Sequence, residues 1–239
     1  MRRYTRRHWY KPAEEKVNRL LDEFQEGLDR VEKRFHGFVQ KEAGRKGMHI
    51  SCREGCTHCC RYTFICTFPE GMLIARHMLV WWHEAIVSAV EGRLEWCREK
   101  QEEKGSTGWF AMKEQCAFLN KGTGQCTIYS VRPGNCRFHL AVSEPALCEN
   151  GESAAIANAQ KASELRSRMS EEFMKVLTSE PHLIMATLPR AVLIGLQALR
   201  AGRYILECKS KEESKQIYEE KWKPSHDMPS VKQEDISTE

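Results

Sequence analysis

Four cysteines lie within nine residues of one another, at Cys52, Cys56, Cys59 and Cys60. A second series follows further along the chain and consists of Cys116, Cys126, Cys136 and Cys148. Structural zinc sites take four thiolates or imidazoles, and the common iron–sulfur clusters are also held by four cysteines. These eight cysteines could therefore supply two metal centres, and they are our predicted ligands.

The spacing alone does not distinguish zinc from an iron–sulfur cluster, because both accept tetrahedral thiolate ligation. Cys148 is the weakest member of the set, since its spacing differs and its neighbours carry no motif. His58 and His139 are reserve ligands, for which we prefer a supporting or surface role. Cys66 and Cys208 are predicted to be structural, although Cys66 is near enough to replace a ligand. Cys97 has no cysteine neighbour at ligand spacing and is interpreted as an ordinary thiol.

Cations are expected near the ligands, because four thiolates leave a zinc ion or an oxidised four-iron cluster with a net charge of about −2. The arginines within a few residues of a proposed ligand are Arg53, Arg61, Arg132 and Arg137. Backbone N–H groups of Gly55 and Gly134 could donate to sulfur as well. For these arginines, an ordinary solvated surface charge is the competing interpretation.

The composition narrows the class of protein. Of the 239 residues, 37 are Lys or Arg and 33 are Asp or Glu, an imbalance too small and too scattered to argue for nucleic acid by itself, and we do not expect nucleic acid as a partner. The most apolar windows are interrupted by charges or proline, which predicts no membrane span, and the N-terminus lacks a secretory signal. The 11 cysteines are an odd number, better explained by metal ligation in a reducing, cytoplasmic setting than by disulfides.

A long helix is predicted from Pro12 to about Lys41, after a basic flexible arm at residues 1–11. Its apolar residues recur at spacings of four and three, the pattern of one buried helix face. They are Val17, Leu21, Phe24, Leu28, Val31, Phe35 and Phe38. The strict alternation lasts about three heptads, so either packing on the protein's own helices or self-association could bury this face.

Further elements are predicted around the cysteines. Thr67-Phe-Pro-Glu70 is a capping box that begins a helix running to about residue 101, with a bend near Gly92. Residues 105–108 read as a loop, and the two glycines in 120–125 favour a hairpin that carries Cys116 and Cys126 at its open end. We find no internal repeat other than the equal cysteine spacing.

The C-terminal part continues the helical pattern. Amphipathic helices are predicted at residues 153–177 and 188–206, followed by a charged tail at 209–239 that we expect to be disordered. The predicted organisation is one mainly α-helical domain at 12–208. It holds an irregular, cysteine-rich, metal-binding lobe at about residues 50–148 with one short β-hairpin.

Three segments carry a resemblance to a known family. They are the cluster Cys52 to Cys60, the segment Cys116-Ala-Phe-Leu119, and the segment from Cys126-Thr-Ile-Tyr129 through Arg132-Pro133 to Cys136-Arg137. In these segments the chain resembles the CxxCxxCC-type cysteine-cluster family, described as zinc- or iron-chelating. The first cysteine gap has three intervening residues instead of two, and the resemblance covers about residues 52–148. A similar cluster occurs in flagellin lysine-N-methylases, which implies an enzymatic alternative.

These observations favour a metal-binding protein whose zinc or iron–sulfur centre chiefly organises the lobe. The first alternative is an iron–sulfur-dependent enzyme such as a relative of protein-lysine N-methylases. Against it, the sequence has no glycine-rich cofactor loop after a strand and no evident catalytic triad or carboxylate pair. The second alternative is an interaction adaptor that binds an unknown protein partner through the N-terminal helix or the tail. Membrane binding is not expected.

Overall fold

A computed structural model describes residues 15–53, 55–142, 145–150, 164, 166–171 and 185–201, and its architecture is mainly α-helical as predicted. The α-helices are α1 (Glu15–Arg45), α2 (Phe68–Trp81), α3 (Glu84–Ala111), α4 (Gly134–Phe138), α5 (Pro145–Glu149) and α7 (Leu188–Ala201). Two 3-10 helices are η1 (His58–Arg61) and η2 (Tyr129–Val131). The strands are β1 (Ile65–Thr67), β2 (Leu119–Asn120), β3 (Gln125–Cys126) and β4 (Met185–Thr187).

The centre of the fold is a pair of strand–helix units. Strand β1 pairs antiparallel with β4 in the register Ile65↔Thr187 and Thr67↔Met185, and each strand leads directly into a helix, α2 or α7. The two helices pack closely: a Cβ added at Gly195 would lie 2.7 Å from the carbonyl oxygen of Gly71. Such close contact requires residues without a side chain at the crossing.

The two units also share a sequence pattern that the sequence analysis missed. Residues 67–75 read TFPEGMLIA and residues 187–195 read TLPRAVLIG. The shared threonine and proline mark the two helix starts, and the shared leucine and isoleucine lie in the core. The prediction that the chain has no repeat beyond its cysteine spacing was therefore wrong. The similarity was overlooked because the two copies are 120 positions apart in the sequence. They become neighbours only in the fold, where β1 pairs with β4.

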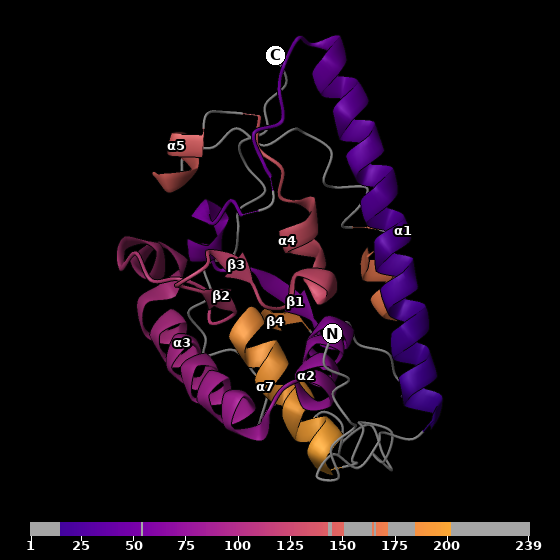
Figure 1. The fold of residues 1–239 in the computed structure, drawn as a ribbon, viewed down its shortest axis with the longest axis vertical. Helices are drawn as coiled ribbons and strands as arrows, with labels where there is room; N and C mark the ends of the chain where they lie inside the picture. Colours follow the sequence, from indigo (N-terminus) through magenta and orange to yellow (C-terminus); the bar gives the residue numbers. More distant parts are fainter. Residues whose placement is uncertain are drawn as a thin grey trace.

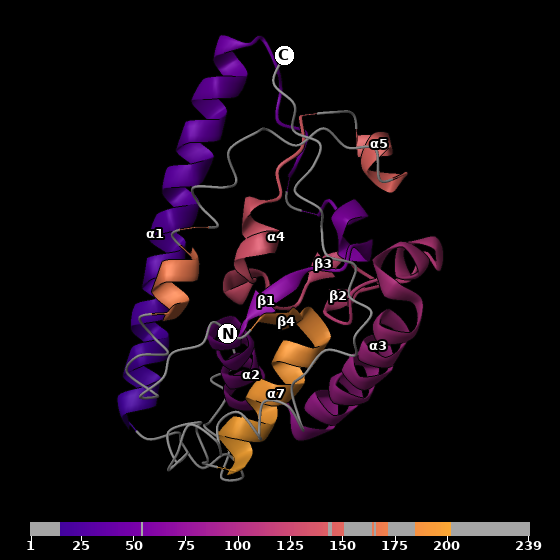
Figure 2. The same ribbon diagram turned by 180° about the vertical axis from the view of Figure 1, so that it is seen from behind.

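The long N-terminal helix is confirmed. Helix α1 runs along one side of the molecule and α3 along the opposite side, with α2 and α7 between their lower ends (Figure 1 and Figure 2). Six of its seven predicted core residues are buried. Phe38 is the exception, with 42% of its surface exposed, and Val39 is buried in its place. A strict heptad drifts relative to a straight helix of 3.6 residues per turn, which shifts the buried position by one residue.

The predicted helix from 68 to about 101 is in fact two helices. The capping box at Thr67 and Glu70 is present, but α2 ends at Trp81 and α3 begins at Glu84. The break comes at His83, whose Nδ1 accepts a hydrogen bond from the backbone N–H of Ala85 at 3.2 Å. The predicted bend near Gly92 was wrong. The loop predicted at 105–108 lies within α3, where Gly105 adopts a φ of 65° and kinks the helix.

The predicted hairpin is present but short, with Leu119 opposite Cys126 and Asn120 opposite Gln125. The Asn120 side chain accepts backbone hydrogen bonds from Gly122 and Thr123 and so closes the turn. The last predicted helix is confirmed as α7 up to Ala201.

Several predicted segments lie outside the described residues: the arm at 1–11, most of the helix at 153–177, and the tail at 209–239. Residues 166–171 of the predicted helix are described and are helical. Among the helices that the structure describes, none combines the length and the apolar character needed to cross a bilayer.

Candidate metal centre

The first cysteine cluster is shaped by a tight turn and a single 3-10 turn. Gly55 has a φ of 83°, a conformation that side chains disfavour, and the N–H of Cys56 bonds to the carbonyl of Arg53 at 3.0 Å. Helix η1 follows and contains Cys59 and Cys60. These turns let three thiols leave a short length of backbone in different directions.

The second cysteine series is brought to the first by a backbone hydrogen bond. The N–H of Cys116 donates to the carbonyl of Cys60 at 2.7 Å, which joins segments 56 positions apart. Cys126 lies on strand β3 and Cys136 on helix α4, close behind the turn at Pro133 and Gly134. The hairpin and the turn thus bring Cys116, Cys126 and Cys136 to the same region of the fold.

Six of the eight predicted ligands line one cavity of about 240 Å³. They are Cys56, Cys59, Cys60, Cys116, Cys126 and Cys136. Arg53 and Arg132 line the same cavity, together with the apolar side chains of Leu119, Ile128 and Leu188. The spacing of the cysteines therefore predicted residues that gather in space, although they come from three elements and two loops.

Cys52 and Cys148 do not line this cavity. The sulfur of Cys52 accepts a hydrogen bond from the backbone N–H of Ala141 at 3.1 Å, and its thiol lies 3.8 Å from the carbonyl oxygen of His139. Cys148 is buried on helix α5, and its carbonyl oxygen accepts a hydrogen bond from the Tyr62 hydroxyl at 3.0 Å. Burial raises the pKa of Cys52, and the nearby thiols of Cys59, Cys56 and Cys148 raise it further. The two cysteines thus belong to the same lobe but lie at its edge.

The sulfurs are gathered but not drawn tightly together. Within the described ranges, no three Cys, His, Asp or Glu side chains converge closely enough to hold a metal ion. The expected division of the eight sulfurs into two groups of four is therefore not seen. The donor set nevertheless suits a soft metal, because thiolates select zinc and iron–sulfur clusters over hard cations.

In the absence of a metal, the protein environment raises the pKa values of four thiols that line the cavity, those of Cys59, Cys116, Cys126 and Cys136. Burial raises the pKa of Cys116 to about 12 and that of Cys136 well above its ordinary value. The pKa of Cys59 is raised first by its hydrogen bond with Cys60 and then by burial. A positive charge opposes these shifts: Arg132 lowers the pKa values of Cys59, Cys126 and Cys136. A bound cation would have to replace these protons.

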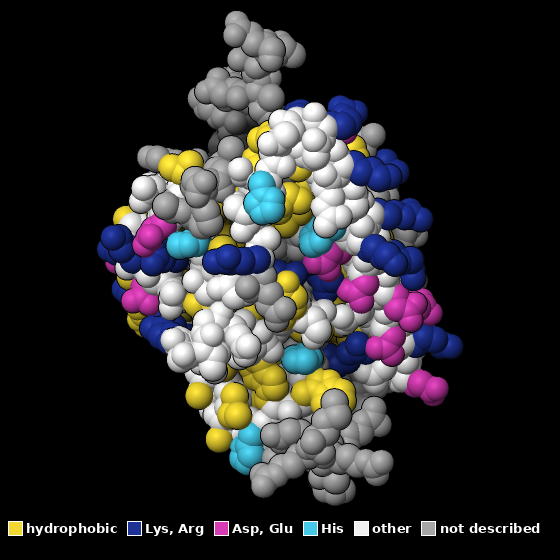
Figure 3. All heavy atoms as spheres, turned by 45° about the horizontal axis from the view of Figure 1, so that its top comes forward, with side chains coloured by type: hydrophobic (Ala, Val, Ile, Leu, Met, Phe, Trp, Pro, Cys, Tyr) yellow, Lys and Arg dark blue, Asp and Glu magenta, His cyan; other side chains and the backbone are white. Residues whose placement is uncertain are grey.

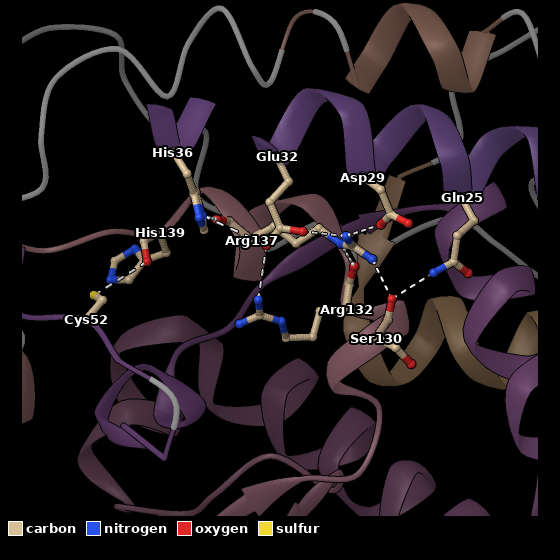
Figure 4. Close-up of polar contacts among 9 residues, drawn as sticks. All are labelled: Gln25, Asp29, Glu32, His36, Cys52, Ser130, Arg132, Arg137 and His139. Carbon is tan, nitrogen blue, oxygen red and sulfur yellow. Dashed lines mark hydrogen bonds and ion pairs between the residues drawn. The ribbon is translucent and has the colours of Figure 1, made fainter. Parts of the chain in front are cut away.

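Arg132, which lines the cavity, and Arg137, which does not, both bond to Glu32 of helix α1 (Figure 4). One oxygen of Glu32 accepts from Arg132 at 3.1 Å and the other from Arg137 at 2.6 Å. Arg137 is 3% exposed, also pairs with Asp29 at 2.7 Å, and donates to the carbonyl of Ser130 at 2.8 Å. Arg137 was expected either near the ligands or on the solvated surface, and it is in neither place: its buried guanidinium bonds to α1 and does not line the cavity.

Of the other arginines and histidines singled out from the sequence, one lines the cavity and the others do not. Arg53 lines the cavity, whereas Arg61 forms an ion pair with Glu149 of α5 at 3.4 Å. His139 packs edge-on against Tyr62 and Phe64, with ring centroids 5.3 Å and 5.7 Å away, and burial lowers its pKa. Neither His58 nor His139 lines the cavity.

The buried carboxylate of Glu70 holds the turn before Cys136 through a contact that the sequence did not predict. Glu70 is 1% exposed and accepts from the backbone N–H groups of Thr67 and Gly134, both at 2.7 Å. Asn135 donates to the carbonyl of Ile65 at 2.8 Å and accepts from Arg166 at 2.8 Å. The capping box predicted one of the two Glu70 contacts. The other depends on tertiary structure, and no local pattern indicates it.

A second, smaller cavity of about 20 Å³ lies behind the first and shares Cys60 and Cys116 with it. Cys97 is 1% exposed and lines this smaller cavity, next to the side chains of Gln101 and Trp109. Burial raises the pKa of Cys97 to about 11. Cys66 is buried on β1 and lines neither cavity. Cys97 and Cys66 therefore pack close to the cluster without facing the main cavity.

Comparison with known proteins agrees with this site. Residues 51–162 match the family model CxxCxxCC, whose description is "Putative zinc- or iron-chelating domain". No curated protein and no solved structure matches the chain. The matched segment begins just before Cys52 and includes all eight predicted ligands.

Proposed function

Since residues 51–162 of the chain belong to the CxxCxxCC family of zinc- or iron-chelating domains, we propose that the protein holds a thiolate-bound iron–sulfur cluster in the cysteine-lined cavity. The observation that supports this choice is the cavity itself: six cysteines surround a space of about 240 Å³. A single tetrahedral zinc ion is enclosed by four ligands at about 2.3 Å and needs far less space.

The surroundings of the cavity suit a negatively charged centre. Arg53 and Arg132 face it, and Arg132 is held in place from behind by Glu32 and over the ring of Tyr129, with 3.8 Å between the guanidinium carbon and the ring centroid. The apolar side chains of Leu119, Ile128 and Leu188 form part of the remaining wall, and such less polar surroundings strengthen the attraction between arginine and thiolate. Arg132 therefore offsets charge at the centre while its own charge is shared with Glu32.

The six cysteines that line the cavity are the candidate ligands, from which one cluster would take four: Cys56, Cys59, Cys60, Cys116, Cys126 and Cys136. When bound, an iron–sulfur cluster supplies reversible one-electron chemistry at a potential set by charge and hydrogen bonding around the sulfurs. These residues exceed the four ligands that one cluster needs. A centre with a thiolate for every metal position favours a structural or electron-carrying role over one that binds substrate at the metal.

The alternatives lead to different compositions of the purified protein. A structural zinc centre, in which four thiols close around one ion, is the second candidate, supported by the family description. The enzymatic alternative, a protein-lysine N-methylase relative, would need an open metal position or a pocket for a methyl donor beside the cluster.

Anaerobic purification followed by iron, zinc and acid-labile sulfide analysis tests the proposal. We expect iron and sulfide in equal amounts, with a visible absorption band that Cys59→Ser abolishes and Cys97→Ala leaves in place. Stoichiometric zinc without sulfide would replace the cluster with the second candidate. Less than about half an equivalent of either metal after reconstitution would refute metal binding as such.

A further inference from the structure

Helix α1 carries opposite charges on its two halves. Residues 15–29 contain five acidic and two basic side chains, whereas residues 30–45 contain five basic side chains and two acidic ones. Figure 3 shows the result on the surface: Lys and Arg side chains form a column along the side where α1 lies, and Asp and Glu side chains gather below them. The small net charge of the whole chain conceals this separation.

The nearby acidic side chains neutralise only part of the outer face of this half. Glu26 pairs with Arg30 at 3.6 Å. Glu32 is turned inward and bonds to Arg132 and Arg137 (Figure 4). Glu42 is 23% exposed and pairs with Arg45 at 3.2 Å. Lys33, Arg34 and Lys41 are exposed and form no ion pair within the part of the chain that the structure describes.

The cations of this half form one stripe. At 3.6 residues per turn, Arg30, Lys33, Arg34, Lys41 and Arg45 fall on a face about 120° wide and about 22 Å long. All five are exposed. We call this face the basic stripe of α1. It lies on the side of α1 opposite Val31, Phe35 and Val39, which pack into the core.

The basic stripe also carries two glycines that the fold itself does not need. A Cβ built at Gly37 or Gly44 would meet no atom of the described residues within 4 Å. Glycine inside a helix costs roughly 0.5–1 kcal/mol relative to alanine, so these two positions are unfavourable for α1 alone. Because these two positions have no side chain, the backbone of a bound molecule could approach the helix closely between the cations. Phe38, with 42% of its surface exposed, borders the same face.

We propose that the basic stripe of α1 binds the phosphate backbone of a nucleic acid, independently of base sequence. This function is separate from the metal centre and does not rest on it. Along the axis of a duplex each strand presents one phosphate about every 3.4 Å, so a stripe of this length would face several of them. The open glycines permit main-chain proximity, and Phe38 offers an aromatic surface to an unpaired base.

A nucleic acid fits the stripe better than a lipid surface does. A helix that lies in a membrane interface must bury an apolar face among the lipids. The apolar face of α1 is already buried in the protein, and the only large apolar side chain described on the stripe is Phe38. An acidic protein segment would share the charge but not the regular spacing of phosphates.

Fluorescence anisotropy with labelled 20-nucleotide single-stranded DNA and a 20-base-pair duplex, both of random sequence, tests the proposal on the full chain. We expect log Kd to rise with log salt concentration with a slope of about 0.7–0.9 per phosphate contact, and thus about 3–4 in total. Replacing Lys33, Arg34 and Lys41 by Gln should weaken binding by about two orders of magnitude at 0.1 M salt and reduce the slope by about 2–3.

Matched variants separate local geometry from total charge. Replacing Lys16, in the acidic half of α1, together with Lys113 and Lys121 by Gln removes the same charge outside the basic stripe and should leave Kd within about twofold. Gly37→Gln keeps every charge and should weaken binding at least fivefold while α1 keeps its helical circular dichroism. Equal losses from the two lysine–arginine triples would overturn the proposal. Binding to phosphatidylserine vesicles or to polyglutamate as tight as to DNA would do the same.

Discussion

The carboxylate of Glu70 accepts a hydrogen bond from the backbone N–H of Gly134 at 2.7 Å, inside a site where Glu70 is 1% exposed. Its other oxygen caps the start of α2 through Thr67. The same side chain thus begins a core helix and fixes the turn that delivers Cys136 to the cavity. The helical domain and the cysteine lobe are joined at this residue.

Glu70→Gln should destabilise the protein by about 2 kcal/mol, because a hydrogen bond to a buried charged acceptor contributes about 1.5–3 kcal/mol. Glu70→Ala should cost more, since it leaves the N–H groups of Thr67 and Gly134 unpaired. Urea unfolding of the metal-loaded protein measures both. Glu95→Gln, at an exposed position on α3, serves as the control and should change the unfolding free energy by less than about 0.5 kcal/mol.

On the other side of the lobe, we expect the contacts between Arg137 and α1 to contribute to stability as well. Arg137→Lys should destabilise by roughly 1–3 kcal/mol, because one ammonium cannot reproduce the forked bonds to Asp29, Glu32 and the Ser130 carbonyl. Thermal unfolding in parallel with Arg30→Lys provides the comparison. Arg30 is 66% exposed and 3.6 Å from Glu26, so its replacement should have almost no effect. Equal shifts would show that the buried network does not hold α1 to the lobe.

These contacts mark the limit of what the sequence could predict. Local signals identified the capping box, the hairpin turn and the cysteines, because each depends on a few neighbouring residues. The pairing of β1 with β4 and the second bond of Glu70 join residues that are far apart in the chain. Phe38 was wrongly placed in the core because a strict heptad was followed one step too far. His83 ended α2 by capping α3, although its sequence surroundings read as continuous helix.

Acidification should release the metal and loosen the lobe. Ligation requires thiolates, and burial raises the pKa of Cys116 to about 12, so protons compete with the metal increasingly as the pH falls. We expect the cluster absorbance and the bound metal to decrease together on titration from pH 8 to pH 5 under anaerobic conditions. Removal of the metal by a chelator at pH 8 should produce the same loss of tertiary structure, seen by near-ultraviolet circular dichroism. Release of metal without that loss would show that the metal does not organise the fold.

The two kinds of glycine in this chain should respond to alanine in opposite directions. At Gly195 an added Cβ would lie 2.7 Å from the carbonyl oxygen of Gly71 and 2.9 Å from the backbone nitrogen of Met72, and backbone cannot move aside as a flexible side chain can. Gly195→Ala should therefore destabilise by about 1–3 kcal/mol through overpacking of α2 against α7. At Gly44, where the space is open, Gly44→Ala should stabilise by about 0.5–1 kcal/mol through helix propensity. Urea unfolding of the two single variants measures both changes in unfolding free energy. If Gly195→Ala stabilised the protein, the two strand–helix units would have to pack less closely than the structure shows.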